Sequence, residues 1–175
     1  TRVTTGVKDT TGNTLSSQLE TSTGFKTWSG THQLGTSSND RGKGIIIDAS
    51  DNIYITGHTY GNLDANTNNG GKDVFIMKFS PSGNKDYTIL YGTSANDDGN
   101  GISLDSSNNI YIGGSTNLIN GSESAYPDIL ILKYNSNQAL QWNINYGGSN
   151  RGDTGHGVSN DSNGNVYVSG ENNPT

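Results

Sequence analysis

The stretch GKGIIIDASDNIYITG, from Gly42 to Gly57, returns twice more along this chain. It recurs as GNGISLDSSNNIYIGG over residues 99–114 and as GHGVSNDSNGNVYVSG over residues 155–170, with a period of about 56 residues. A long motif that returns at a fixed spacing indicates a repeat protein, in which each copy forms the same structural unit. Residues at equivalent positions of the three copies are therefore expected to have the same structural role.

Each copy of the motif predicts a β-hairpin. The Ile-rich segment Gly44–Asp48 and the Ile- and Tyr-rich segment Asn52–Gly57 are typical of strands. The Asp-x-Ser/Asn-x-Asn sequence between them favours a tight turn, because Asp accepts backbone N–H bonds and Asn or Gly adopts the left-handed conformation. We assign this structural role to Asp48, Asn52, Asp105, Asn109, Asp161 and Asn165.

The second strand of each hairpin alternates two kinds of side chain. In the first copy Ile53 and Ile55 share one face and Tyr54 occupies the other. The same alternation recurs in the other two copies. We therefore expect both faces of this strand to be at least partly covered.

Two more strands follow the hairpin in the first two units. DVFIMKFS (residues 73–80) and DILILKYN (residues 128–135) are almost continuously apolar, as in strands covered on both faces. After turns at residues 81–84 and 135–138, the more polar segments 85–91 and 139–146 are typical of edge strands. Four antiparallel strands per repeat predict an all-β fold built from β-propeller blades.

The motif also resembles a known family. GxGIxxDxxxNIYIxGxT, followed by DxFIxKF, SGN and then YGT or YGG, resembles the bacterial β-propeller repeat called SBBP, over roughly residue 28 to the end. The resemblance implies a propeller in a secreted or surface-exposed protein of bacterial type. It implies no common enzymatic activity.

We expect about three blades in this chain. Residues 28–91 and 92–147 form two repeats, residues 148–175 form the first two strands of a third, and residues 1–27 supply degenerate strands that complete a blade. Residues 3–13 align with residues 74–84 as a third strand and its turn; alternatively, residues 1–13 imitate the Gly-Thr-Ser loop that opens a repeat. Since closed propellers typically have about four to eight blades, either copies of the chain assemble or it is a piece of a longer one.

Composition narrows the functional classes. Only 29% of the 175 residues are hydrophobic and 25 are glycine, which suits a thin, repeated core. A net charge of −6 argues against nucleic acid as a partner. There is no cysteine, so neither disulfide nor thiol chemistry is expected, and no apolar run suggests membrane insertion. A start at Thr1 suggests a mature or excised product, consistent with an extracellular or cell-surface location.

The loops predict one binding surface. The opening loops (residues 35–44, 92–101 and 148–157) and the joining loops (58–72 and 115–127) are expected on one face of the propeller. Their carboxylates, amides, hydroxyls and aromatic rings suit a glycan or protein ligand; the alternative is that they are simply solvated. The candidate ligand-binding residues are His58, Tyr60, Asp64, Asn66, Glu123, Tyr126, Arg151, Asp153 and His156.

Calcium is the one cofactor for which the sequence offers ligands. Asp40, Asp97 and Asp98 place carboxylate oxygens in two opening loops. Aligned with them, the third unit carries Arg151 and Gly152, so we do not expect this metal site to repeat.

No motif predicts a reaction. The sequence has no nucleophile elbow, phosphate loop or zinc-ligand spacing, and His32, His58 and His156 occupy non-equivalent positions. We therefore predict a non-catalytic module that acts by binding or by self-assembly through shared blades. The alternatives are a structural subunit of a surface filament or ring and, more weakly, a propeller-type hydrolase with His58 or His156 as its base.

Overall fold

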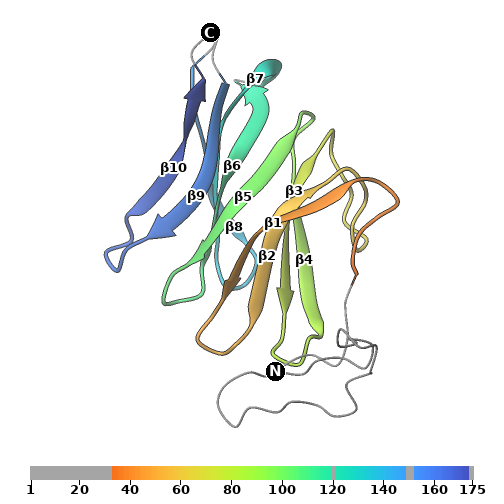
Figure 1. Ribbon diagram of the computed structural model, residues 1–175, viewed down its shortest axis with the longest axis vertical. Helices are drawn as coiled ribbons and strands as arrows, with labels where there is room; N and C mark the ends of the chain where they lie inside the picture. The colour runs from red at the N-terminus through yellow and green to blue at the C-terminus, as the bar shows by residue number, and fades with distance from the viewer. Residues whose placement is uncertain (1–32, 120, 149–151, 174–175) are drawn as a thin grey trace, which may run out of the picture.

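The computed structural model describes residues 33–119, 121–148 and 152–173, and their regular elements are all β-strands (Figure 1). The strands predicted in residues 1–27 lie outside the described residues. Within the described ranges, we find no helix with the length and apolar character needed to cross a bilayer.

The strands form three antiparallel sheets, which we call blades 1, 2 and 3. Blade 1 has the order β1 (Asp40–Ile47), β2 (Ile53–Thr59), β3 (Asp73–Phe79) and β4 (Lys85–Tyr91). Blade 2 has the order β5 (Asp97–Leu104), β6 (Ile110–Ile119), β7 (Ser122–Tyr134) and β8 (Leu140–Tyr146). Blade 3 comprises β9 (Gly152–Asn160) and β10 (Val166–Asn173).

The four-stranded antiparallel unit is confirmed, and β4 and β8 lie at sheet edges as predicted. The first strand of each blade, however, begins earlier than expected: β1 starts at Asp40, well before Gly44. The reason is a β-bulge between Gly42 and Gly44, which lets pairing with β2 continue through residues that resemble a loop. Blade 2 has the same bulge between Gly99 and Gly101.

The predicted joining loop 115–127 is also largely strand. β6 and β7 continue as a hairpin beyond the sheet, with Leu118 paired to Glu123 and Ile119 paired to Ser122. Its Ser- and Asn-rich sequence led to the loop prediction. Backbone pairing, which does not depend on apolar side chains, extends the two strands instead.

The Asp-capped turn is built in the same way in all three blades. In blade 2, Asp105 Oδ1 accepts the backbone N–H groups of Ser107 (2.9 Å) and Asn109 (3.0 Å), and Oδ2 accepts Asn109 Nδ2 (2.8 Å). The Tyr111 hydroxyl donates to the same Oδ2 at 3.1 Å, a contact that the turn motif alone did not suggest. Asn108 adopts the left-handed conformation (φ 58°). The corresponding left-handed residues in blades 1 and 3 are Asp51 and Gly164.

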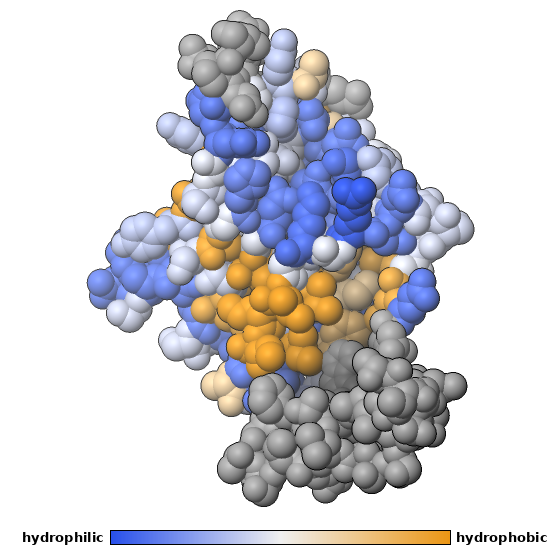
Figure 2. Space-filling view, in the orientation of Figure 1, coloured by the Kyte–Doolittle hydropathy of each residue, from blue (hydrophilic) through white to orange (hydrophobic). Residues whose placement is uncertain are grey.

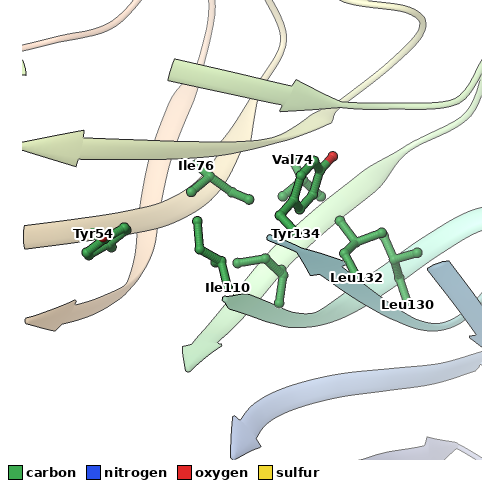
Figure 3. Close-up of a cluster of buried hydrophobic side chains, with 8 residues drawn as sticks. Tyr54, Val74, Ile76, Ile110, Leu130, Leu132 and Tyr134 are labelled. Atoms are coloured by element: carbon green, nitrogen blue, oxygen red, sulfur yellow. The ribbon is translucent and has the colours of Figure 1, made fainter. Parts of the chain in front are cut away.

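Blades 1 and 2 pack face to face around the main core (Figure 3). Strand β5 lies against β1, β2 and β3, and β9 lies in the same way against β5, β6 and β7, so β1, β5 and β9 follow one another as the innermost strands. The core residues are Tyr54, Val74, Ile76, Ile110, Ile112, Leu130, Leu132 and Tyr134.

Coverage of the tyrosine face differs among the blades. Tyr54 and Tyr111 are buried, as the alternation predicted, whereas Tyr167 in blade 3 is 58% exposed. The opposite face of blade 1 carries a second apolar cluster, formed by Leu63, Phe75, Met77 and Phe79, with Ile53, Ile55 and Leu90 against it.

Candidate functional site

A charged cluster lies where blade 1 meets blade 2. Asp98, near the start of β5, accepts hydrogen bonds from Lys43 Nζ (2.9 Å to Oδ1) and from Lys72 Nζ (2.6 Å to Oδ2). His58 in β2 contacts the same carboxylate through Nδ1. Lys43 comes from the β1 bulge and Lys72 immediately precedes β3, so blade 1 supplies all three partners of a blade 2 carboxylate. We call these four residues the junction cluster.

The junction cluster carries an excess of positive charge. Burial of Asp98 raises its pKa, but hydrogen bonds from Lys72 and Lys43 lower it more, so the net pKa lies below the usual range. Burial lowers the pKa of His58, and its attraction to Asp98 only partly opposes this. The cluster therefore combines two lysine side chains with a carboxylate whose charged form is favoured and an imidazole whose neutral form is favoured.

Aromatic and polar groups surround the junction cluster. The Tyr60 ring meets the His58 ring edge-on with centroids 5.8 Å apart, and Tyr60 is 44% exposed. Lys43 Nζ also donates to Asn100 Oδ1 at 2.8 Å, and Asn100 Nδ2 donates to the Gly155 carbonyl at 2.7 Å. These bonds connect the innermost strands of all three blades.

A shallow polar hollow adjoins the cluster. The Lys72 backbone N–H donates to Asn96 Oδ1 at 3.1 Å, which joins the cluster to one wall of the hollow. The amide of Asn117 reaches across it to the Ser124 carbonyl at 2.8 Å. The residues lining the hollow are Gly71, Ser94, Ala95, Asn96, Asn117 and Ser124.

The junction cluster is not repeated between blades 2 and 3. The pairing registers place Asn100 at the bulge position of Lys43, Ser115 at the position of His58, and Thr154 at the position of Asp98. Pro127 precedes Asp128 as Lys72 precedes Asp73. The fold forms both junctions, so it does not require these charges.

Of the ligand residues predicted from the sequence, the structure brings His58 and Tyr60 together. Asp64 accepts hydrogen bonds from Lys85 and from Thr88 Oγ1, and Asn66 Nδ2 donates to the Leu63 carbonyl at 3.0 Å. Asn66 Nδ2 also lies 3.3 Å from the Thr88 carbonyl, to which it donates, so Asp64 and Asn66 fasten the joining loop to β4.

The remaining predicted ligand residues are spread over blades 2 and 3. Tyr126 is exposed on β7, and His156 lies 3.7 Å from the Glu171 carboxylate. Asp153 is buried and accepts the Gly148 N–H at 3.2 Å. Arg151 and the side chain of Glu123 lie outside the described residues.

The aspartates predicted as calcium ligands hold the opening loops. Asp40 Oδ2 accepts the Thr36 N–H at 2.6 Å, and Asp97 Oδ2 accepts the Thr93 N–H at 2.7 Å. Pairing of β9 with β10 shows that Asp153 is the counterpart of Asp97, so the alignment with Arg151 and Gly152 was wrong. In the part of the chain that the structure describes, no three His, Cys, Asp or Glu residues are grouped to hold a metal ion.

Sequence reasoning missed Lys43 and Lys72 as site residues. A signal was present: the residue between the two glycines of the repeated motif is Lys43, Asn100 or His156, whereas its neighbours repeat. Because the side chain at this position varies while the backbone repeats, the fold does not require a particular side chain there. The partner of Lys43, Asp98, could not be inferred, because it belongs to the next blade.

Stacked antiparallel sheets with β1, β5 and β9 innermost define the blades of a β-propeller protein. The SBBP family, described as a beta-propeller repeat, matches residues 30–64 and 86–118. Two segments of the chain therefore match the SBBP β-propeller repeat, as the resemblance predicted. No curated protein matches the chain.

Proposed function

We propose that this chain is a non-catalytic, extracellular β-propeller module that works by associating through the faces of its blades. One observation carries the proposal. The face of blade 1 turned away from blade 2, on which Ile45 and Ile47 are exposed, corresponds, position by position, to the face of blade 2 that packs against blade 1.

The correspondence follows from the shared pairing registers. Ile110, Ile112, Leu130 and Leu132 in blade 2 have no exposed surface. Their counterparts in blade 1 are Ile53, Ile55, Phe75 and Met77, and Ile45 and Ile47 correspond to Ile102 and Leu104.

The two faces differ in exposure at β1, whereas Phe75 and Met77 on β3 are each only 5% exposed. Ile45 is 67% exposed and Ile47 is 59% exposed, and an apolar patch is visible over β1 and β2 (Figure 2). Exposed contiguous apolar surface on a sheet marks an interaction site. We call this the blade 1 face.

The occupant of the blade 1 face is a second copy of this chain. The interface already formed between blades 1 and 2 shows what fits such a face: another blade of the same repeat. In the described residues, β10 pairs only with β9, so blade 3 offers an open sheet edge at the other end of the array. Contact between unlike ends of two copies is heterologous and generates a ring or a filament.

The extracellular location rests on the resemblance to surface-exposed proteins, and the cysteine-free composition leaves the redox compartment open. We assign no catalytic role to His58. Its ring is buried between Asp98 and Tyr60, and burial lowers its pKa.

Size-exclusion chromatography with light scattering tests the proposal. The chain should run as a multiple of 18.5 kDa, and the double variant Ile45→Lys, Ile47→Lys should run as a monomer. Tyr126→Lys, which places a charge on an exposed tyrosine of blade 2, is the matched control and should keep the assembled mass. A monomeric wild-type chain would contradict assembly between copies.

A further inference from the structure

We propose that the junction cluster binds the carboxylate group of an acidic saccharide. This site goes beyond blade association, since it uses the loop edge of the molecule and not the blade 1 face. Three independent features of the site support it: charge, reachable donors and the chemistry of its surroundings.

Charge is the first feature. Of the six Lys and Arg residues in the described ranges, Arg41, Lys43 and Lys72 lie at this corner, where Arg41 is paired across the sheet with His58. Asp98 supplies one negative charge against them. The flanking carboxylates Asp40, Asp73 and Asp97 accept backbone N–H groups, so Asp98 is the carboxylate that contacts the lysine ammonium groups, and cations gathered at one corner attract anions.

The other three cations in the described ranges are engaged elsewhere. Lys78 Nζ lies 3.1 Å from Asp86, and Lys85 pairs with Asp64. Lys133 Nζ lies over the Tyr111 ring, 5.0 Å from its centroid. The excess charge at the junction is therefore a local feature of this corner.

The second feature is that the ammonium groups can be reached and have donors to spare. The side chains of Lys43 and Lys72 remain 31% and 24% exposed. An ammonium group has three N–H donors. Among the described residues, Lys43 donates to Asp98 and Asn100, and Lys72 Nζ donates to Asp98. A second carboxylate can accept the remaining donors through charge-assisted hydrogen bonds.

The third feature selects a sugar over an acidic peptide. The half-exposed Tyr60 ring offers an apolar face of the size of a pyranose. The adjoining hollow presents amides and hydroxyls from Asn96, Asn117, Ser94 and Ser124, which match sugar hydroxyl groups as donors and acceptors. It presents little apolar surface for the side chains of a peptide.

The cluster's absence from the next junction supports a ligand role. Burying Asp98 between two lysines costs desolvation energy, and the equivalent positions between blades 2 and 3 do without ions. A costly feature that the fold does not need is consistent with a function at this junction. Repeated features such as the Asp-capped turns are explained by the fold alone.

Isothermal titration calorimetry with trigalacturonic acid at low salt tests the proposal. The wild-type chain should bind it, whereas the neutral trisaccharide of galactose should bind at least about tenfold more weakly, because it lacks the carboxylates. The variant Lys43→Ala, Lys72→Ala should lose at least about tenfold in affinity. Lys78→Ala removes a lysine of the same blade that is paired with Asp86, so it should leave affinity unchanged.

Removing both lysines leaves Asp98 buried without a cation, which destabilises the fold. A second variant therefore separates loss of stability from loss of binding. The triple variant Lys43→Ala, Lys72→Ala, Asp98→Asn removes the stranded charge and should fold, as judged by its circular dichroism and melting temperature, yet bind no trigalacturonate. Unaltered affinity in the folded triple variant would overturn the proposal, as would absence of wild-type binding.

Two more titrations separate the alternatives. Equal affinity for a triglutamate peptide would overturn the choice of a saccharide, and weaker peptide binding would support it. Titration of the monomeric Ile45→Lys, Ile47→Lys variant should give wild-type affinity. Failure of blade association therefore does not alter the result expected at this site.

Discussion

The carboxyl group of Asp73 lies against the Cα of Gly92, where a Cβ would come within 2.0 Å of Oδ1. In blade 2 a Cβ on Gly147 would lie 2.1 Å from Asp128 Oδ1. The glycine of the repeated YGT or YGG motif is therefore a packing requirement. The buried aspartate at the start of the third apolar run occupies the space of its missing side chain.

Gly92→Ala should consequently destabilise the chain by roughly 1–3 kcal/mol, the usual cost of overpacking a buried site. Urea denaturation followed by tryptophan fluorescence measures it. Gly148→Ala is the matched control: a Cβ there meets no atom within 4 Å, and stability should barely change. Equal effects of the two substitutions would contradict the packing argument.

Asp73, whose carboxyl feels the nearby charge of Asp97, predicts a pH dependence. Both are fully buried, and Oδ1 of each has no hydrogen-bond partner in the described structure. Burial raises the pKa of Asp73, a backbone hydrogen bond from Asn69 opposes this, and the negative charge of Asp97 raises it further. The pKa of Asp73 is therefore higher in the folded chain than in the unfolded chain. The stability associated with protonated Asp73 is complete below the unfolded pKa and is lost as the pH rises through the folded pKa.

Asp73→Asn, which mimics the protonated acid, should therefore raise the melting temperature at pH 7 and have less effect at pH 4. Differential scanning calorimetry across that range measures the change. Asp86→Asn, at a partly exposed carboxylate paired with Lys78, should show no such gain at pH 7. A lower melting temperature at pH 7 for Asp73→Asn would show that the buried carboxylate is stabilised in its charged form.

The turn carboxylates predict the opposite pH dependence. Burial raises the pKa of Asp105, but hydrogen bonds from Asn109, Ser107 and Tyr111 outweigh it and the net pKa is lowered. The stability that Asp105 contributes is therefore present above its unfolded pKa of about 3.9 and lost as pH falls through the folded pKa. Asp105→Ala should cost roughly 1–3 kcal/mol at pH 7, because partly buried donors that bond a charged acceptor lose it.

Chemical denaturation at pH 7 and pH 3 measures the effect of Asp105→Ala. The cost should shrink at pH 3, because pH 3 lies below the unfolded pKa, where the stability contributed by the charged carboxylate is being lost. Ser106→Ala, at an exposed position in the same turn, is the control and should stay within about 0.5 kcal/mol of wild type. A cost that does not depend on pH would mean that the charge of Asp105 is not what holds the turn.

Ile112 and Ile45 lie on corresponding faces of blades 2 and 1, and they should differ sharply in their response to truncation. Ile112 is fully buried between blades 1 and 2, so Ile112→Ala should cost roughly 2–5 kcal/mol. Ile45 lies on the blade 1 face, and Ile45→Ala should cost under about 1 kcal/mol in a dilute, dissociated sample. If the cost at Ile45 grows with protein concentration, that face is covered in the assembly.

Much of the fold could be predicted because its determinants are local and repeated. The Asp-x-Ser/Asn-x-Asn sequence holds its own turn through Asp105 and Asn109, and β4 was predicted with the bounds that the structure has. Strand starts were misjudged because Gly42 and Gly44 look like a loop until the partner strand shows that they flank a bulge. The polar β6–β7 extension was missed because its pairing leaves no hydrophobic pattern.

The candidate site was only partly predictable. His58 and Tyr60 stood out from the sequence, and they do lie together. Lys43, Lys72 and Asp98 did not form a group in the sequence, since Lys43 and Asp98 are 55 residues apart. A calcium pattern was considered for Asp98 because neighbouring carboxylates were visible in the sequence and the two lysines that surround it were not.

The amino-acid sequence by itself determined the hairpins, their turns and the stacking of repeated sheets, because alternating apolar residues and turn-forming aspartates act within a few residues of chain. Tertiary structure alone decided which blade faces are covered and which charges meet. Ile102 and Ile45 occupy the same place in the repeat, yet Ile102 packs against the main core and Ile45 is 67% exposed. The physical reason is that burial and electrostatic pairing depend on the neighbouring sheet, which no local pattern specifies.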